Sequence, residues 1–156
     1  MYNEKMIKKE VITKSPRDTK KIGQSLGEIA ARSKKLFLVC LNGDLGGGKT
    51  TFVQGFAKGL EVKEDITSPT FIVFKKYLGK NGKKFYHFDA YRINTDDLAV
   101  LGFKEILSDE NNIVLIEWAD NIKESLVKKT IEINFIFQKE KERKLIIKGD
   151  DDIIEN

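Results

Sequence analysis

The sequence predicts an α/β domain in which helices flank a central sheet of mixed parallel and antiparallel strands. Short apolar stretches with strand character alternate with segments of helical periodicity, which favours parallel pairing. A hairpin signal in the middle of the chain and two successive strand patterns near its end add antiparallel pairing. A chain of 156 residues can bury a substantial core without disulfides or metals. We therefore expect one domain over residues 1–156, with residues 149–156 as a flexible tail.

The first two elements are a strand and a long helix. Residues 6–13 alternate loosely between apolar and polar side chains and predict the strand. Ser15 is the expected N-cap of the helix, Pro16 its first residue, and Asp18 the residue that completes a capping box. The helix is expected to continue to about residue 32. Its apolar face is predicted to consist of Ile22, Leu26, Ile29 and Ala30.

A glycine-rich loop then joins a buried strand to a second helix. The apolar residues 36–41 predict the strand, and residues 43–50 read GDLGGGKT, which fits the phosphate-loop pattern G-x-x-x-x-G-K-[ST]. Phe52 and Phe56 recur at helical spacing behind the loop, and Gly59 is expected to end the helix. The context of strand, loop and helix is the one that such a loop requires.

This loop predicts that the chain binds a nucleoside triphosphate. Successive glycines allow backbone N–H groups to surround an anion, with the helix dipole behind them. Lys49 can reach the β- and γ-phosphates, and the Thr50 hydroxyl can ligate Mg²⁺. The residues expected to contact the nucleotide here are Asp44, Leu45, Gly46, Gly47, Gly48, Lys49, Thr50 and Thr51.

The rest of the chain predicts further strands and one more helix. The expected elements are a strand over 71–78, a hairpin turn over 79–82, a return strand over 84–89, a helix over 95–107, a buried strand over 112–117, a strand over 131–137, a charged turn over 138–143 and a strand over 145–148. The Asn81-Gly82 pair supplies the positive φ angles that the hairpin turn needs.

Two of these strands end in a carboxylate that could hold Mg²⁺ or its waters. Glu117 follows four apolar residues, and Asp89 ends the return strand. Each has a plainer interpretation: Glu117 forms a buried ion pair, and Asp89 caps its turn or pairs with Arg92. For His87, a hydrogen-bonded strand histidine is favoured over a catalytic one.

Trp118 and the segment around Ser68 leave alternatives open. Trp118 either packs in the core or contacts the nucleotide. Ser68 and Thr70 lie where a switch segment could sense the γ-phosphate, although Ser-Pro-Thr is also a common turn.

Bulk properties set the class of protein and its expected location. The net charge of +4 and the pI near 9.0 are interpreted first as a lysine-rich solvated surface, and second as contact with nucleic acid or an acidic protein. The single cysteine, Cys40, is expected to be a small buried side chain without a disulfide. No apolar run approaches the roughly 18 residues of a membrane span, and the N-terminus does not resemble a signal peptide. A cytoplasmic location without membrane contact is therefore expected.

Taken together, the motifs resemble those of the TsaE family, also called YjeE. After the helix that starts at Ser15, the resembling blocks are GDLGGGKTTF at 43–52, TSPTF at 67–71, YHFDAYR at 86–92, LGFKEIL at 101–107 and IEW at 116–118. They occur in order over residues 15–125. Such a set of blocks is far more specific than the loop alone.

The resemblance implies a P-loop NTPase-like fold and a weak ATPase that uses ATP and Mg²⁺. It implies TsaB and TsaD as partners, which transfer a threonylcarbamoyl group to adenosine 37 of tRNAs that read codons beginning with A. ATP hydrolysis would reset the TsaB–TsaD assembly, and tRNA would be contacted only through that complex.

The resemblance also implies roles for individual residues. Lys49, Asp89 and Glu117 would be the catalytic residues, with Thr50 and Glu117 on the metal. Thr67, Ser68, Pro69 and Thr70 would form a switch segment, and Trp118 would lie close to the nucleotide. Arg92 would face phosphate or a partner.

Two other functions use the same loop. A small-molecule or nucleoside kinase commonly has an arginine-rich lid, whereas Arg17, Arg32, Arg92 and Arg143 are widely separated along this chain. A GTP-binding switch would carry the guanine-reading N/T-K-x-D pattern, which is absent from the sequence. Both are less favoured than the ATPase.

Overall fold

The computed structural model describes residues 5–44, 46, 48–69, 73–126 and 130–154. The elements, in chain order, are β1 (Met6–Thr13), α1 (Pro16–Arg32), β2 (Phe37–Gly43), α2 (Lys49–Gly59), β3 (Phe74–Leu78), the 3₁₀ turn η1 (Lys80–Gly82), β4 (Lys84–Asp89), α3 (Thr95–Val100), α4 (Phe103–Ser108), β5 (Asn112–Glu117), the 3₁₀ segment η2 (Ala119–Ser125), β6 (Ile131–Lys139), β7 (Glu142–Asp150) and α5 (Asp151–Ile154). Within these ranges no helix is long and apolar enough to cross a membrane.

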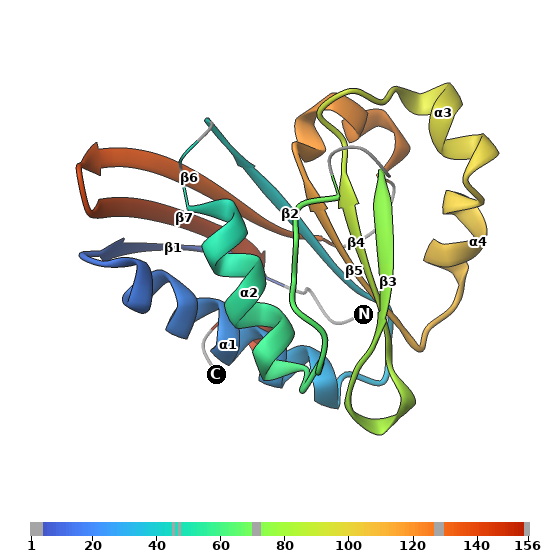
Figure 1. The fold of residues 1–156 in the computed structure, drawn as a ribbon, viewed down its shortest axis with the longest axis horizontal. Coiled ribbons are helices and arrows are strands. Elements are labelled where there is room, and N and C mark those ends of the chain that lie inside the picture. Colours follow the sequence, from blue (N-terminus) through green and yellow to red (C-terminus); the bar gives the residue numbers. More distant parts are fainter. Residues whose placement is uncertain (1–4, 45, 47, 70–72, 127–129, 155–156) are drawn as a thin grey trace.

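The strands form one mixed sheet of seven strands in the order β1-β7-β6-β2-β5-β4-β3 (Figure 1). The centre is parallel: β2 pairs with β5 and β6, and β4 pairs with β5. Both sides are antiparallel, since β7 pairs with β6 and β1, and β3 pairs with β4. The predicted α/β class with a mixed sheet is therefore confirmed.

Alternating side chains of the central strands build two cores on opposite faces of the sheet. Val39 and Leu41 of β2 belong to the core that α1 and α2 cover, whereas Leu38 and Cys40 belong to the core that α3, α4 and η2 cover. Cys40 is buried, and burial raises the pKa of its thiol to about 12. The expectation that Cys40 is a buried, unreactive side chain agrees with this environment.

Glycines mediate the close contact between α1 and α2, which lie side by side (Figure 1). A Cβ at Gly23 or Gly27 of α1 would overlap a backbone carbonyl oxygen of α2. A Cβ at Gly55 or Gly59 of α2 would likewise overlap a carbonyl oxygen of α1. Without these glycines the two backbones could not approach so closely.

This contact changes the interpretation of both helices. Ala30 is buried as predicted, but Ile22, Leu26 and Ile29 are partly buried, and glycines occupy the middle of the covered face. Gly59 is the last residue of α2, as predicted, but its small size serves the contact with α1. The left-handed residue beyond the helix is Glu61, with φ 57°.

The N-terminus of α1 is capped nearly as expected. The Ser15 hydroxyl accepts a hydrogen bond from the Asp18 N–H at 3.1 Å. The Asp18 carboxylate accepts from the Lys14 N–H at 3.0 Å, so it reaches one residue before the N-cap. In the usual capping box this side chain would instead accept from the N–H of the N-cap residue itself.

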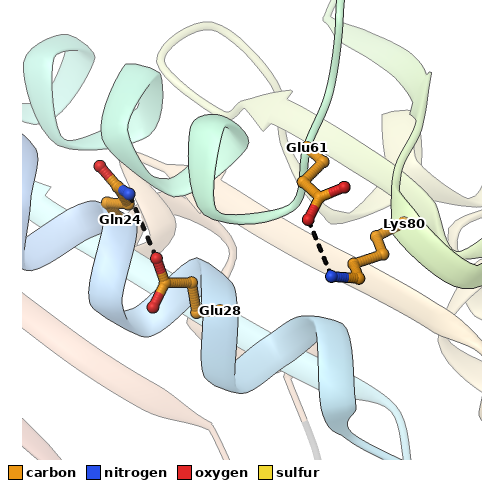
Figure 2. Close-up of polar contacts among 4 residues, drawn as sticks. All are labelled: Gln24, Glu28, Glu61 and Lys80. Atoms are coloured by element: carbon orange, nitrogen blue, oxygen red, sulfur yellow. Dashed lines mark hydrogen bonds and ion pairs between the residues drawn. The ribbon is translucent and has the colours of Figure 1, made fainter.

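The β3–β4 hairpin is attached to the end of α2. Asn81 and Gly82 have φ angles of 59° and 71°, which confirms the predicted turn. The Lys80 N–H donates to the Leu60 carbonyl at 2.7 Å. Figure 2 shows the ion pair between Lys80 and Glu61, with 2.8 Å between Nζ and Oε1, and the Gln24–Glu28 hydrogen bond on α1.

Several predicted elements need correction. The charged turn predicted over 138–143 covers only residues 140–141, because β6 continues to Lys139 and β7 starts at Glu142. The helix predicted over 95–107 is two short helices, because Gly102 adopts φ 69° between α3 and α4. Of the strand predicted over 71–78, residues 71–72 lie outside the described part of the chain, Val73 is a bend, and β3 covers Phe74–Leu78. The strand predicted over 36–41 starts one residue later and continues to Gly43.

The expected flexible tail is also wrong for residues 149–154. Strand β7 is longer than the predicted 145–148 because β1 pairs with it from Met6–Asp150 to Thr13–Arg143. Residues 151–154 form α5, and Ile154 is buried at 9% exposure beside Gly149. The segment after the acidic residues 150–152 therefore contributes one buried apolar side chain, Ile154, to the core.

The glycine contact predicts that Gly27→Ala destabilises the protein. In an exposed helix, replacing glycine by alanine stabilises by about 1 kcal/mol. Here the added methyl overlaps the Phe56 carbonyl, so we expect the free energy of unfolding to fall by about 1–3 kcal/mol. Chemical denaturation of both proteins measures the difference in the free energy of unfolding. Ser25→Ala on the exposed side of α1 is the control, with a change within about 0.5 kcal/mol. A more stable Gly27→Ala protein would contradict the close contact.

Candidate functional site

A cleft of about 570 Å³ lies where the parallel strands reach their carboxyl ends. One wall comes from the glycine-rich loop (residues 43–50) and the start of α2, and another from Asp89 and Glu117. The N-terminus of α1 and the β6–β7 hairpin complete the lining. Segments that are distant in the sequence therefore meet at one end of the sheet.

Positive φ angles explain the glycines of the loop. Gly46 has φ 75° and Gly48, which precedes α2, has φ 96°; L side chains rarely adopt either. Gly46 and Gly48 line the cleft. The predicted contacts at Leu45 and Gly47 lie outside the described residues.

Lys49 is the buried cation of the cleft, with 6% of its surface exposed. Its ammonium donates to the carbonyl oxygens of Gly43 and Asp44, the latter at 2.9 Å. Nζ also lies 4.2 Å from the centroid of the Trp118 ring. Burial lowers the pKa of Lys49, while the nearby carboxylates of Glu117, Asp44 and Asp89 oppose that shift.

The other predicted loop residues divide between two surfaces. Thr50 and Thr51 line the cleft next to Lys49, and Thr50 is exposed. Asp44 lines a neighbouring groove together with Asn42 and Asp120, and its backbone carbonyl receives Lys49. Thr50 and Thr51 therefore both border the cleft, as a metal-binding role for Thr50 would require.

Glu117 is held by His87. The carboxylate Oε2 lies 2.6 Å from Nε2 of His87, which is fully buried, while Glu117 is 4% exposed. Because a carboxylate accepts, we assign the proton of this hydrogen bond to Nε2. The His87 ring is parallel to Phe85, with 5° between the ring planes. The hydrogen bond at Nε2 agrees with the predicted strand histidine, whereas Nδ1 is buried without a hydrogen-bond partner among the described residues. Glu117 has the buried partner that its plainer interpretation required.

Asp89 lies beside Glu117 at the edge of the sheet. The register of β4 and β5 pairs these two residues directly. The Asp89 carboxylate accepts a hydrogen bond from the Tyr91 N–H at 2.9 Å, which confirms the capping interpretation as one of its roles. Asp89 is 8% exposed and lines the cleft, so capping leaves its side chain at the site.

Trp118 belongs both to the core and to the cleft. Its ring packs against Tyr91 with 5.0 Å between centroids and contacts the core on the α3–α4 face. It also lines the cleft under Lys49. Trp118 adopts φ 58°, which is uncommon for a residue other than glycine and recurs at functional sites. Trp118 therefore packs against the core, as one interpretation predicted, and also lines the cleft, while its contact with a nucleotide stays a prediction.

In the predicted switch segment, Ser68 lines the cleft. The Thr67 hydroxyl accepts a hydrogen bond from Lys75 at 2.8 Å, and the Pro69 carbonyl accepts from the Val73 N–H at 2.8 Å. Val73 has φ 71°, a rare conformation for a β-branched residue. Thr70 lies outside the described residues.

Several residues around the cleft were not predicted as site residues. Ser15, Pro16 and Thr19 enter it because α1 packs so closely on α2. Arg143 lines the cleft from β7. No local pattern identifies these four residues, because the tertiary fold alone brings them to the loop. Arg92, which the family resemblance expected to face phosphate or a partner, also lines the cleft, from the segment after β4.

The fold and the cleft define an α/β protein with a glycine-rich strand–loop–helix unit and two carboxylates at one end of a mixed sheet. The sequence profile of the family described as threonylcarbamoyl adenosine biosynthesis protein TsaE matches residues 13–145. The Bacillus subtilis tRNA threonylcarbamoyladenosine biosynthesis protein TsaE is 38% identical over 121 residues, 78% of this chain and 73% of that protein. The Treponema pallidum protein of the same name is 33% identical over 124 residues, 79% of this chain and 87% of that protein.

The fold is similar to that of a solved relative. The crystal structure of Bacillus subtilis YdiB matches with a TM-score of 0.72 and 29% identity, covering 93% of this chain and 87% of that one. The chain belongs to the TsaE family of threonylcarbamoyl adenosine biosynthesis proteins. The resemblance seen in the sequence motifs is thereby confirmed.

The buried His87–Glu117 pair predicts strong coupling between these residues. His87→Leu leaves the Glu117 carboxylate without its imidazole donor, so we expect a loss of about 2–4 kcal/mol in the free energy of unfolding. In the double variant His87→Leu/Glu117→Leu, the loss should be smaller than the sum of the single losses by at least about 1 kcal/mol. Chemical denaturation of the four proteins measures this coupling. Additive effects would show that the pair is energetically unimportant.

Proposed function

We propose that this chain binds Mg²⁺-ATP in the cleft and hydrolyses it. The hydrolysis supports a TsaB–TsaD complex that threonylcarbamoylates adenosine 37 of tRNAs reading codons that begin with A. The observation that carries the proposal is the convergence of the glycine-rich loop, Lys49, Asp89 and Glu117 in one cleft. Membership of the TsaE family and the names of the relatives support the pathway.

The residues of the cleft suit the chemistry of both ligands. Gly46 places no Cβ in the cleft, and an ideal Cβ built there meets nothing within 4 Å, so a bulky anion can approach the backbone closely. The Thr50 hydroxyl and the Glu117 carboxylate are the hard oxygen donors that Mg²⁺ prefers. We therefore propose a P-loop NTPase-like site with Thr50 and Glu117 at the metal.

Each catalytic residue has a distinct proposed role. Lys49 would exchange the carbonyl oxygens of Gly43 and Asp44 for phosphate oxygens, which offer it a full negative charge. His87 holds Glu117 in one orientation, and Asp89 lies beside it to orient water. Bound Mg²⁺ would neutralise charge on the phosphates, so the contribution of the protein is positioning and electrostatic stabilisation.

We also propose roles for the other residues around the nucleotide. Ser68 would report on the γ-phosphate from the switch segment at 67–70, and Trp118 would pack beside the nucleotide. Asp44 and Thr51 would complete the contacts of the loop. The partners would be TsaB and TsaD, with tRNA contacted through them, in the cytoplasm.

A kinase that uses the same cleft remains a competing function, because Arg92 and Arg143 both line it. The wide separation of the arginines along the sequence therefore does not argue against a kinase. The two functions differ in their need for an acceptor. An ATPase releases phosphate from ATP in water alone, whereas a kinase requires a second substrate.

Removal of either carboxylate is expected to impair hydrolysis more than binding. For Asp89→Ala and Glu117→Ala we expect kcat for ATP to fall about 100-fold or more, with the Kd for ATP within about tenfold of the parent. Phosphate release and calorimetry measure the two quantities. Glu110→Ala, an exposed carboxylate just before β5 and at the opposite end from Glu117, is the matched control. Normal turnover in both variants would refute the catalytic assignment.

The TsaB–TsaD pair is expected to raise the rate of ATP hydrolysis. The purified chain should release phosphate slowly, and the rate should rise as the pair is titrated in. Lys49→Ala should show neither the basal nor the stimulated rate, because it removes the buried cation that would meet the phosphates. A rate of ATP turnover that does not change with the TsaB–TsaD pair but rises with a small-molecule acceptor would favour the kinase.

A further inference from the structure

Arg143 connects the β6–β7 hairpin to the glycine-rich loop. Its Nε and Nη2 donate to the carbonyl oxygen of Gly46 at 3.3 and 3.0 Å. Its Nη1 donates to the carbonyl oxygens of Lys139 and Glu142, both at 2.9 Å, and of Glu140 at 3.3 Å. One guanidinium thus bridges the turn of the hairpin and the loop, 97 residues apart in the sequence.

Arg143 contacts the loop at Gly46, a residue whose backbone has little intrinsic rigidity. Gly46 has φ 75°, and a Cβ built there has no atom within 4 Å, so nothing packs against Gly46 on that side. Glycine loses more conformational freedom on ordering than any other residue. A loop rich in glycine therefore binds an anion well only if another part of the fold holds it in place.

We propose that Arg143 is a positioning residue that holds the glycine-rich loop in its anion-binding form through the Gly46 carbonyl. The inference rests on the proposed nucleotide site, since it assigns Arg143 a part in the affinity of that site. Arg143 itself lines the cleft, but among the described residues the hydrogen bonds of its guanidinium go to backbone carbonyls of the hairpin and the loop. It acts on the nucleotide through the loop.

The geometry favours arginine over lysine at this position. The guanidinium offers N–H groups in a planar fork, so Nη1 can face the hairpin while Nε and Nη2 face Gly46. The same plane lies over Phe137, with Cζ 4.9 Å from the ring centroid, and cross-strand pairing sets Phe137 opposite Arg143. A lysine ammonium could not span both groups of carbonyls from one rigid plane.

Comparing Arg143→Ala with Lys139→Ala separates the positioning of the loop by Arg143 from the effect of losing a positive charge near the cleft. Both remove one positive charge from the same hairpin, but only Arg143 donates to Gly46. Amide ¹⁵N relaxation of Gly46 and Gly48, without nucleotide, measures the order of the loop, and calorimetry measures the Kd for ATP and for ADP. Thermal unfolding of each variant checks the fold. Arg143→Lys and Arg143→Gln serve if the alanine variant does not fold.

We expect Arg143→Ala to lower the order parameter of Gly46 from about 0.85 to about 0.6 or less, or to introduce microsecond–millisecond exchange there. The Kd for ATP and ADP should rise about tenfold, against at most about twofold for Lys139→Ala. Arg143→Lys should recover only part of the affinity. An unchanged order parameter of Gly46 without new exchange, or equal losses of nucleotide affinity in the two alanine variants, would overturn the inference. If the parent chain binds no ATP, the proposed function fails, while the relaxation of Gly46 still decides whether Arg143 holds the loop.

Discussion

The close contact between α1 and α2 is the constraint on which the site depends. Four glycines let the two backbones approach until carbonyl oxygens of one helix lie against the Cα atoms of the other. This contact places α2, and with it Lys49 and the glycine-rich loop, relative to the sheet. It also brings the N-terminus of α1 into the cleft, where Ser15 and Pro16 form part of the lining. A packing contact between residues that do not line the cleft therefore helps to shape the site.

Electrostatics organises the other side of the cleft. Parallel pairing brings Asp89 and Glu117 to the same edge of the sheet, where two adjacent carboxylates repel each other. The fold compensates with Lys49 from the loop and with a hydrogen bond from the buried His87. Lys49 in turn rests on the ring of Trp118, whose strained backbone directs that ring into the cleft. The charges are thus positioned by packed groups, which suits a site that acts by preorganisation.

Much of the fold and the site was predictable from local signals. Residues 6–13, 84–89 and 112–117 carry strand patterns that the structure reproduces without a shift. The motif at 43–50 and the carboxylates at the strand ends predicted residues that the cleft brings together. The failures occur where context overrides the pattern. Gly102 interrupts a segment with helical periodicity, and pairing with β1 extends β7 into a stretch whose charges suggested a loose tail.

By itself, the sequence determined the order of strands and helices, the glycine-rich loop, Lys49 and the two carboxylates, because each depends on residues that are close along the chain. Only the tertiary structure decided that His87 donates a hydrogen bond to Glu117 and that Arg143 reaches Gly46. It also decided that glycines, rather than the predicted face of larger apolar side chains, fill the middle of the α1–α2 contact. These relations join residues 29 or more positions apart in the sequence. Spacing cannot reveal them, because they arise from how the sheet is ordered and how closely its covering helices pack.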